Sequence, residues 1–232
     1  MIYTIFALLI VVAYLLGSIP FGLLIAKAHG KDLRTIGSGN IGATNVARAL
    51  GKKWAYICFI LDVLKGLIPM LAAVFVIKTD SSAQAANQAI LLAIWLAVGC
   101  AAILGQIFPI YLKFRGGKGV ATSFGVALGL WPYYTICAMV AVAIWVLVVL
   151  VWRYVSLASI SASIAFPLVL FLAIVLSPVW DIVDLWPLLI VSAAIPLMVI
   201  IRHKKNIKRL LAGTESKILQ KRGAQEHKCT SA

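Results

Sequence analysis

A glycine-rich loop with two cations separates two apolar segments at residues 115–122, Arg-Gly-Gly-Lys-Gly-Val-Ala-Thr. Glycine lets the backbone pass close to a ligand, so successive N–H groups can converge on phosphate oxygens. If Gly119 opens a helix, the positive end of that helix faces the same point. The spacing excludes the Walker nucleotide motif. The loop is therefore a candidate anion site, and the alternative is a turn whose cations only set membrane orientation. Its candidate ligand-binding residues are Arg115, Gly116, Gly117, Lys118 and Gly119.

A second polar loop spans residues 37–48, Gly-Ser-Gly-Asn-Ile-Gly-Ala-Thr-Asn-Val-Ala-Arg. Its glycines match G-x-G-x-x-G, but a dinucleotide site needs a βαβ unit, and this loop lies between two apolar segments. What remains is a set of small hydrogen-bonding side chains followed by one cation: Ser38, Asn40, Thr44, Asn45 and Arg48. Such groups suit a small, anionic, hydroxyl-bearing ligand. The alternative is a capped turn at the membrane interface.

Five further polar residues interrupt or flank the apolar segments. Asp62 and Lys65 lie three residues apart inside one of them, where charges are costly and can pair on one helix face. We expect an ion pair that braces the site, and the alternative is a direct role in catalysis. His203 and Asn206 have the same spacing near the C-terminus. A histidine there can bind phosphate or accept a proton, or it is one more member of a basic cluster. Ser156 opens a later segment and is either an anion donor or a helix cap.

The composition indicates a polytopic membrane protein. Of 232 residues, 63% are hydrophobic and 12% are charged, and the mean hydropathy is +1.04. The net charge of +14 is explained by cations between apolar spans, so we expect no nucleic-acid partner. The four cysteines show no C-x-x-C spacing, which predicts neither a metal site nor a disulfide framework. The first cation is Lys27, which favours a retained first helix over a cleaved signal peptide.

Apolar runs predict seven transmembrane helices, the fourth of them short: 3–27, 54–77, 88–112, 119–131, 132–152, 154–177 and 185–201. With the N-terminus outside and the C-terminus cytoplasmic, the inner segments hold nineteen of the 21 lysines and arginines. Omitting the short helix would break this positive-inside pattern. We expect one membrane domain over residues 1–215, with its site at the cytoplasmic face, and a basic cytoplasmic tail over 216–232.

The sequence lacks three common signatures of catalysis through a general base or a covalent intermediate. There is no His-x-x-x-x-Asp dyad, no Gly-x-Ser-x-Gly and no cysteine in an electropositive loop. A transporter or flippase for small organophosphates is an alternative, because transporters also use short helices that end in glycine loops. A purely structural membrane partner is a third possibility, but it leaves the density of glycine, serine and asparagine unexplained.

Several motifs together resemble one bacterial family, the acyl-phosphate:glycerol-3-phosphate acyltransferases (PlsY). They lie at residues 37–45, 62–66, 108–122 and 203–215. The resemblance implies a seven-helix enzyme of the bacterial inner membrane that needs no cofactor and acts in phospholipid synthesis. It would move a fatty acyl group from acyl phosphate to the 1-position of glycerol 3-phosphate, giving lysophosphatidic acid. The soluble enzyme that makes acyl phosphate would be a candidate partner.

The resemblance also assigns roles to residues. Ser38, Arg48 and Lys118 would be catalytic and, with His203 and Asn206, would bind glycerol 3-phosphate. The glycine loop and Ser156 would hold the acyl phosphate. Gln106 stands where the family usually has histidine, Ile41 replaces a common proline, and Arg115 a common lysine. Since acyl phosphate has a good leaving group, we expect direct, substrate-assisted transfer with no acyl-enzyme.

Overall fold

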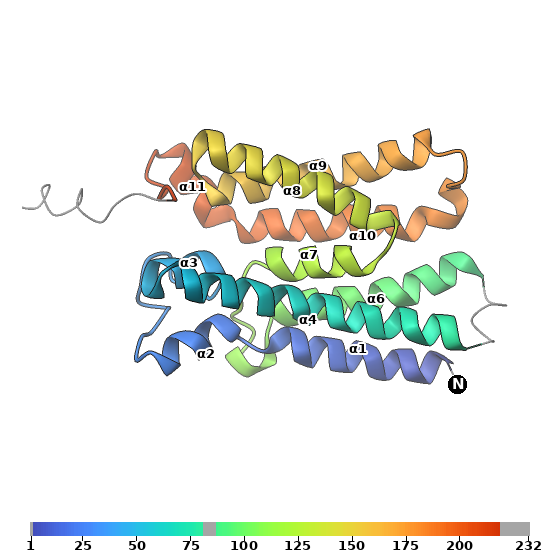
Figure 1. The fold of residues 1–232 in the computed structure, drawn as a ribbon, viewed down its shortest axis with the longest axis horizontal. Helices are drawn as coiled ribbons and strands as arrows, with labels where there is room; N and C mark the ends of the chain where they lie inside the picture. The colour runs from blue at the N-terminus through green and yellow to red at the C-terminus, as the bar shows by residue number, and fades with distance from the viewer. Residues whose placement is uncertain (1, 81–86, 219–232) are drawn as a thin grey trace, which may run out of the picture.

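The computed structural model describes residues 2–80 and 87–218 and shows only helices and loops there (Figure 1). The elements are α1 (Ile2–Ser18), α2 (Phe21–Ala28), α3 (Ala43–Leu50), α4 (Lys52–Thr79), α6 (Gln88–Ile107), the 3-10 helix η1 (Ile110–Leu112), α7 (Val120–Gly129), α8 (Tyr133–Trp152), α9 (Val155–Leu176), α10 (Ile182–Arg202) and α11 (Lys204–Leu211). Most of the predicted tail, including Cys229, lies outside the described residues.

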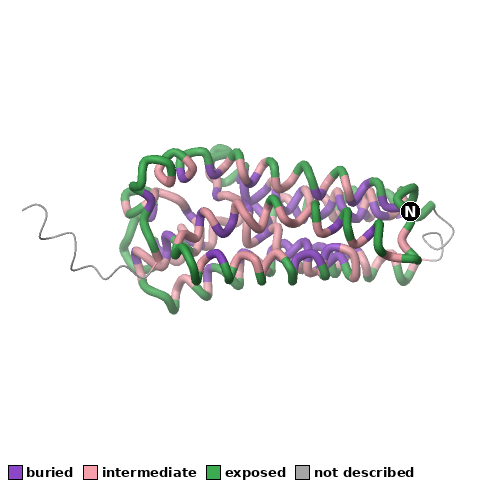
Figure 2. The backbone as a smooth tube through the Cα atoms, turned by 90° about the horizontal axis from the view of Figure 1, so that it is seen from above, coloured by how far each residue is buried: buried purple, intermediate pink, exposed green. Residues whose placement is uncertain are grey.

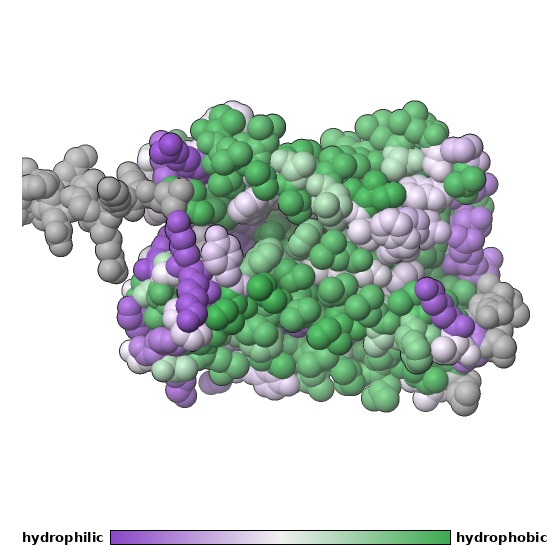
Figure 3. All heavy atoms as spheres, in the orientation of Figure 1, coloured by the Kyte–Doolittle hydropathy of each residue, from purple (hydrophilic) through white to green (hydrophobic). Residues whose placement is uncertain are grey.

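The long helices run side by side in two groups. Figure 1 shows α1, α4 and α6 in one group and α8, α9 and α10 in the other, with α7 between them. Buried residues lie on the inner sides of the helices in Figure 2, and exposed ones lie outside and at both ends. Figure 3 shows hydrophobic residues across the middle of the visible face and hydrophilic residues at its two ends. This is the arrangement expected of a multi-pass membrane protein.

Six helical segments among the described residues are long and apolar enough to cross a membrane, and they correspond to the six long predicted spans. They are Ile2–Ala28, Lys52–Thr79, Gln88–Leu112, Tyr133–Trp152, Val155–Leu176 and Ile182–Arg202. The predicted short helix is present as α7, whose ten residues give a length of about 15 Å. Gly119 opens it, as expected, in a left-handed conformation with φ of 82°.

Prolines break two of the predicted spans near the same end of the bundle. The first is not one continuous helix, because α1 ends at Ser18 and α2 starts after Pro20. The third ends as an α-helix at Ile107, two residues before Pro109, and continues only as η1. Proline lacks an N–H and its ring clashes with the preceding turn, so the α-helical ladder stops at both places.

Glycines allow the closest helix contacts. A Cβ placed on Gly66 of α4 would lie 2.3 Å from the carbonyl oxygen of Thr122, and one on Gly125 of α7 would lie 2.0 Å from that of Val63. Between α1 and α6, a Cβ on Gly17 would lie 2.1 Å from the carbonyl oxygen of Ala102. Small residues let membrane helices approach backbone to backbone, which is the main source of attraction where lipid is as apolar as leucine.

We expect Gly66→Ala to destabilise the fold, because the added methyl group meets the α7 backbone and not a flexible side chain. Overpacking of this kind costs about 1–3 kcal/mol. Thermal unfolding in detergent would measure the loss. Ala193→Val, which adds methyl groups at an exposed position of α10, is the control and should leave the midpoint unchanged. Equal midpoints for both variants would contradict the close contact of α4 with α7.

Candidate functional site

The candidate site residues gather at one end of the bundle, where α2, α3 and α11 lie (Figure 1). Four parts of the chain supply them: the loop before α3, the glycine loop before α7, the start of α9, and the segment from the end of α10 to Glu215. The proline breaks in the first and third spans lie at this end too. The site therefore sits where apolar helices stop and polar loops begin.

The glycine loop folds back against the end of α6. The N–H of Gly116 donates to the carbonyl of Ile107 at 3.2 Å, and that of Gly117 donates to the carbonyl of Gln106 at 3.0 Å. A Cβ on Gly116 would lie 2.3 Å from the Gln106 carbonyl oxygen, so only glycine fits there. These two amides are thus engaged inside the protein. The expectation that they converge on an anion is wrong, because the loop needs them to pack.

Arg202 holds the same loop from its other side. Its guanidinium donates to the carbonyl of Gly116 at 3.1 Å and to that of Gly117 at 3.3 Å. Lys118 and Gly119 make no amide hydrogen bond in the described chain, and Gly119 leads into the first turn of α7. The backbone donors that remain for an anion are therefore those of residues 118–122, at the helix N-terminus.

Lys118 begins a chain of hydrogen bonds that ends on one carboxylate. Its Nζ donates to Asn206 Oδ1 at 2.6 Å, and Asn206 Nδ2 donates to Glu215 Oε1 at 2.6 Å. Ser156 Oγ donates to the same oxygen at 2.7 Å, and Arg209 Nε donates to Glu215 Oε2 at 2.6 Å. Three separate parts of the chain are joined by this network: the glycine loop, the start of α9 and the segment from α11 to Glu215.

The site carries more positive than negative charge. Burial lowers the pKa of Lys118 to about 8; Glu215 opposes this shift, and three arginines, Arg209, Arg48 and Arg202, add to it. Burial also lowers the pKa of Arg48. Burial alone would raise the pKa of Glu215, but the hydrogen bonds from Arg209, Asn206 and Ser156 outweigh it and the pKa is lowered. One ionised carboxylate thus faces four cations, and such a site favours an anionic ligand.

His203 is a buried, neutral side chain and not an exposed member of the basic cluster. Its Nδ1 lies 2.7 Å from the carbonyl oxygen of Val199, which can only accept, so Nδ1 carries the proton. Burial and the nearby Lys118 lower the pKa of His203 to about 4. Nε2 therefore keeps its lone pair at neutral pH and can accept a hydrogen bond or a proton.

The loop before α3 is organised by Asn45. Its buried side chain accepts from the N–H of Ser38 at 3.1 Å and donates to the carbonyls of Leu33 and Ile36, each at 3.0 Å. Asn40 accepts from the N–H of Gly42 at 3.2 Å. The side chain of Asn45 is thus fully used within the protein, while the hydroxyls of Ser38 and Thr44 make no hydrogen bond in the described chain.

Two other candidate residues, Ser156 and Arg115, have different surroundings from those that their positions in the sequence suggested. Ser156 is not a helix cap, since no side chain caps α9, and its hydroxyl is committed to Glu215. Arg115 is exposed, and its side chain makes no hydrogen bond or ion pair with the described residues. Arg202 and Glu215 were missed as site residues. Arg202 belonged to the basic cluster and Glu215 to the last motif, but nothing local to either showed its partner.

The predicted ion pair of Asp62 and Lys65 forms inside the bundle, 3.0 Å apart, and both side chains are almost fully buried. Lys65 Nζ also donates to Gln106 Oε1 and, at 2.9 Å, to the carbonyl of Ile19. Because the Gln106 carbonyl accepts from Gly117, the pair reaches the glycine loop through Gln106. The pair braces the site, as expected, and Gln106 is the link.

Comparison with known proteins adds an independent finding. The family described as "Glycerol-3-phosphate acyltransferase" matches residues 7–213. A relative of that name from Geotalea daltonii is 46% identical over 210 residues, covering 90% of this chain and 95% of the relative. Another of that name, from Aquifex aeolicus, is 44% identical over 209 residues, covering 89% and 96%.

Two solved structures have a similar fold. A crystal structure of PlsY (YgiH), an integral membrane glycerol 3-phosphate acyltransferase in its glycerol 3-phosphate form, gives a TM-score of 0.77 at 43% identity and covers 92% of this chain and 95% of that one. The lysophosphatidic acid form gives 0.74 at 42% identity and covers 91% and 94%.

We expect Glu215→Gln to loosen α11 and lower stability, because three donors lose their charged acceptor. A hydrogen bond to a charged group contributes about 1.5–3 kcal/mol. Thermal unfolding would show the loss, and amide hydrogen exchange would rise in Lys204–Leu211. Asp184→Asn removes an exposed carboxylate near the start of α10 and is the control. Unchanged exchange in α11 would show that Glu215 does not hold this helix.

Proposed function

Since the chain belongs to the glycerol-3-phosphate acyltransferase family, we propose that it transfers a fatty acyl group from acyl phosphate to the 1-position of glycerol 3-phosphate. The products are lysophosphatidic acid and inorganic phosphate, and the reaction serves phospholipid synthesis. One observation carries the proposal: Lys118, hydrogen-bonded to Asn206, lies among three arginines and one carboxylate at the start of a glycine-opened helix. A reaction between two phosphorylated substrates needs this excess of positive charge.

The glycerol 3-phosphate site is proposed between the two polar loops. Lys118 and Arg48 would neutralise its phosphate, and Asn206, already bonded to Lys118, would orient that ammonium. The hydroxyls of Ser38 and Thr44 would bind the glycerol end. Asn40 and Asn45 would support the loop and not touch the substrate, because their side chains already bond its backbone.

The acyl phosphate site is proposed at the N-terminus of α7. The free amides that follow Gly117 would hold its phosphate, with Arg115 at the exposed side. Gly116 and Gly117 would shape the loop without donating to the ligand, because their amides are engaged. Ser156 would act through Glu215 and not bind the phosphate, because its hydroxyl is committed there.

Transfer would be direct. The C1 hydroxyl oxygen forms a bond to the acyl carbon, the bond from that carbon to the phosphate oxygen breaks, and the hydroxyl proton passes to the departing phosphate. Lys118 and the α7 amides stabilise the negative charge that develops. His203 Nε2 is neutral and would accept a hydrogen bond from a substrate hydroxyl, which would orient that hydroxyl for attack.

The membrane arrangement follows from the same proposal. Seven helices would cross or enter the bacterial inner membrane, with α7 as the short fourth one, the N-terminus outside and the C-terminus in the cytoplasm. The concentration of cations in the segments at the site end supports this orientation. A cytoplasmic site would accept glycerol 3-phosphate from solution and acyl phosphate from the soluble enzyme that makes it. A transporter is disfavoured, because the relatives that match nearly the whole chain are named acyltransferases.

We expect purified protein to release inorganic phosphate and form lysophosphatidic acid only when palmitoyl phosphate and glycerol 3-phosphate are both present. Palmitoyl-CoA should not replace the donor. Lys118→Ala should lower turnover by about 10²–10³-fold, the usual cost of removing a donor that stabilises developing charge. Lys205→Ala, which removes an exposed cation of α11, is the matched control and should keep its activity.

The opposite results would reject the proposal in distinct ways. Turnover of glycerol 3-phosphate with palmitoyl-CoA in place of palmitoyl phosphate would show that acyl phosphate is not the required donor. A labelled acyl group trapped on the protein by donor alone would reject direct transfer. No turnover by folded protein, with uptake of a phosphorylated solute into vesicles, would favour the transporter.

The pH dependence of kcat/KM should report the ionisation of Lys118. Its pKa of about 8 means that the ammonium is lost as pH rises through that value. We therefore expect kcat/KM for glycerol 3-phosphate to be level between about pH 6 and 7.5 and to fall about tenfold per unit well above pH 8. Lys118→Arg stays charged, so its profile should remain level there even if its rate is lower. A wild-type profile that stays level to pH 10 would show that Lys118 need not be charged.

A further inference from the structure

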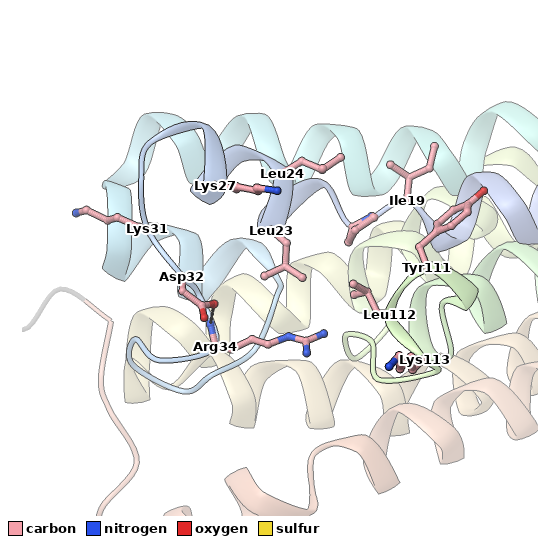
Figure 4. Close-up of a pocket in the computed structure, with 11 residues that line it drawn as sticks. Ile19, Leu23, Leu24, Lys27, Lys31, Asp32, Arg34, Tyr111, Leu112 and Lys113 are labelled. Carbon is pink, nitrogen blue, oxygen red and sulfur yellow. Dashed lines mark hydrogen bonds between the residues drawn. The ribbon is translucent and has the colours of Figure 1, made fainter.

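A basic cavity lies at the same end of the bundle as the Lys118 network and shares no residue with it. Its volume is about 860 Å³, and it opens between α2, the following loop and η1. Figure 4 shows its residues approaching from α2 on one side and from η1 on the other. Since α2 and η1 end the first and third candidate spans, the cavity lies at the level where the membrane meets water.

The wall of the cavity is apolar. Ile19, Leu23 and Leu24 line it from the first span, and Tyr111 and Leu112 from η1. Leu24 is 51% exposed and Tyr111 is 56% exposed, so the apolar wall continues onto the outer surface. A wall of this kind suits a hydrocarbon chain, and it offers nothing to a small soluble anion.

The rim of the cavity is cationic and unbalanced. Lys27, Arg34 and Lys113 make no side-chain hydrogen bond or ion pair with the described residues. Figure 4 shows the Arg34 guanidinium directed toward the side of the cavity that holds Lys113. Lys31 points away and donates to the carbonyl of Ala49. Asp32 is the one carboxylate among the described residues that line the cavity. It accepts from the backbone N–H of Arg34 and neutralises at most one cation.

We infer that this cavity binds an anionic phospholipid of the surrounding membrane. Its phosphate lies among Lys27, Arg34 and Lys113, and its acyl chains lie along Leu23, Leu24 and Tyr111. Unpaired cations that share one cavity repel each other, and a lipid phosphate removes that repulsion. Basic pockets beside membrane helices at the interface bind anionic headgroups in this way. The inference does not depend on the proposed reaction, because it concerns another set of residues.

The test measures lipid retention without substrates. Protein is reconstituted in phosphatidylcholine nanodiscs containing phosphatidylglycerol, extracted with a neutral detergent, and its bound lipid is measured by mass spectrometry. The triple variant Lys27→Gln, Arg34→Gln, Lys113→Gln is compared with Lys52→Gln, Lys53→Gln, Lys205→Gln, which removes the same charge from other exposed cations of the loops and helices at that end. Thermal unfolding in neutral detergent checks that both variants fold.

We expect wild type and control to retain phosphatidylglycerol in preference to phosphatidylcholine. Each cation removed from the cavity should lower that retention about fivefold. Should the triple variant fail to fold, the single variants each give this fivefold change. Leu24→Gln should also lower the retention of phosphatidylglycerol, because it places a polar side chain in the apolar wall.

Other outcomes would overturn the inference. Equal loss in both triple variants would mean attraction to total charge and not to this cavity. Displacement of the lipid by inorganic phosphate would mean a site for a free anion. Equal retention of phosphatidylcholine, or no retained lipid, would mean that the cavity has no preference for an anionic headgroup.

Discussion

The carboxylate of Glu215 is the interaction on which the rest of the site depends. It accepts hydrogen bonds from Ser156, Asn206 and Arg209, and through Asn206 it reaches Lys118. Without it, four cations would face each other in a partly buried space. One carboxylate is enough to hold them in place and too little to neutralise them. A phosphorylated substrate can balance the remaining positive charge. Glu215 thus holds the cations together and still leaves enough positive charge to bind the substrate.

A second, more deeply buried network of hydrogen bonds supports the glycine loop from inside the bundle. The Asp62 and Lys65 pair is buried among apolar helices and bonds Gln106, whose backbone carbonyl holds Gly117. An ion pair there is costly to form and more costly to break, since removing one partner leaves a buried charge. It fixes the depth at which the glycine loop sits. The glycine contacts of α4 with α7 fix the position of the helix that the loop opens.

Much of this could be predicted from local sequence. Hydropathy predicted the six long spans, the glycines predicted the start of α7, and the spacing of Asp62 and Lys65 predicted their pairing. What failed required knowledge of distant contacts. Arg202 meets the glycine loop 85 residues away along the chain, and Ser156 meets Glu215 at a separation of 59. No local pattern shows whether an amide such as that of Gly116 is free or already bonded.

The break in the first span is more than a bend forced by Pro20. Where a helix stops, a backbone carbonyl is left without its usual amide, and at this break the carbonyl of Ile19 accepts from Lys65. The ring of Phe21, just past the break, lies 5.6 Å from the same ammonium. The break in the helix thus places a carbonyl and an aromatic ring around the Lys65 ammonium, which the bilayer cannot hydrate. A straight first helix would remove these contacts from the Lys65 ammonium. The break in the N-terminal span and the position of the glycine loop therefore depend on the same buried lysine.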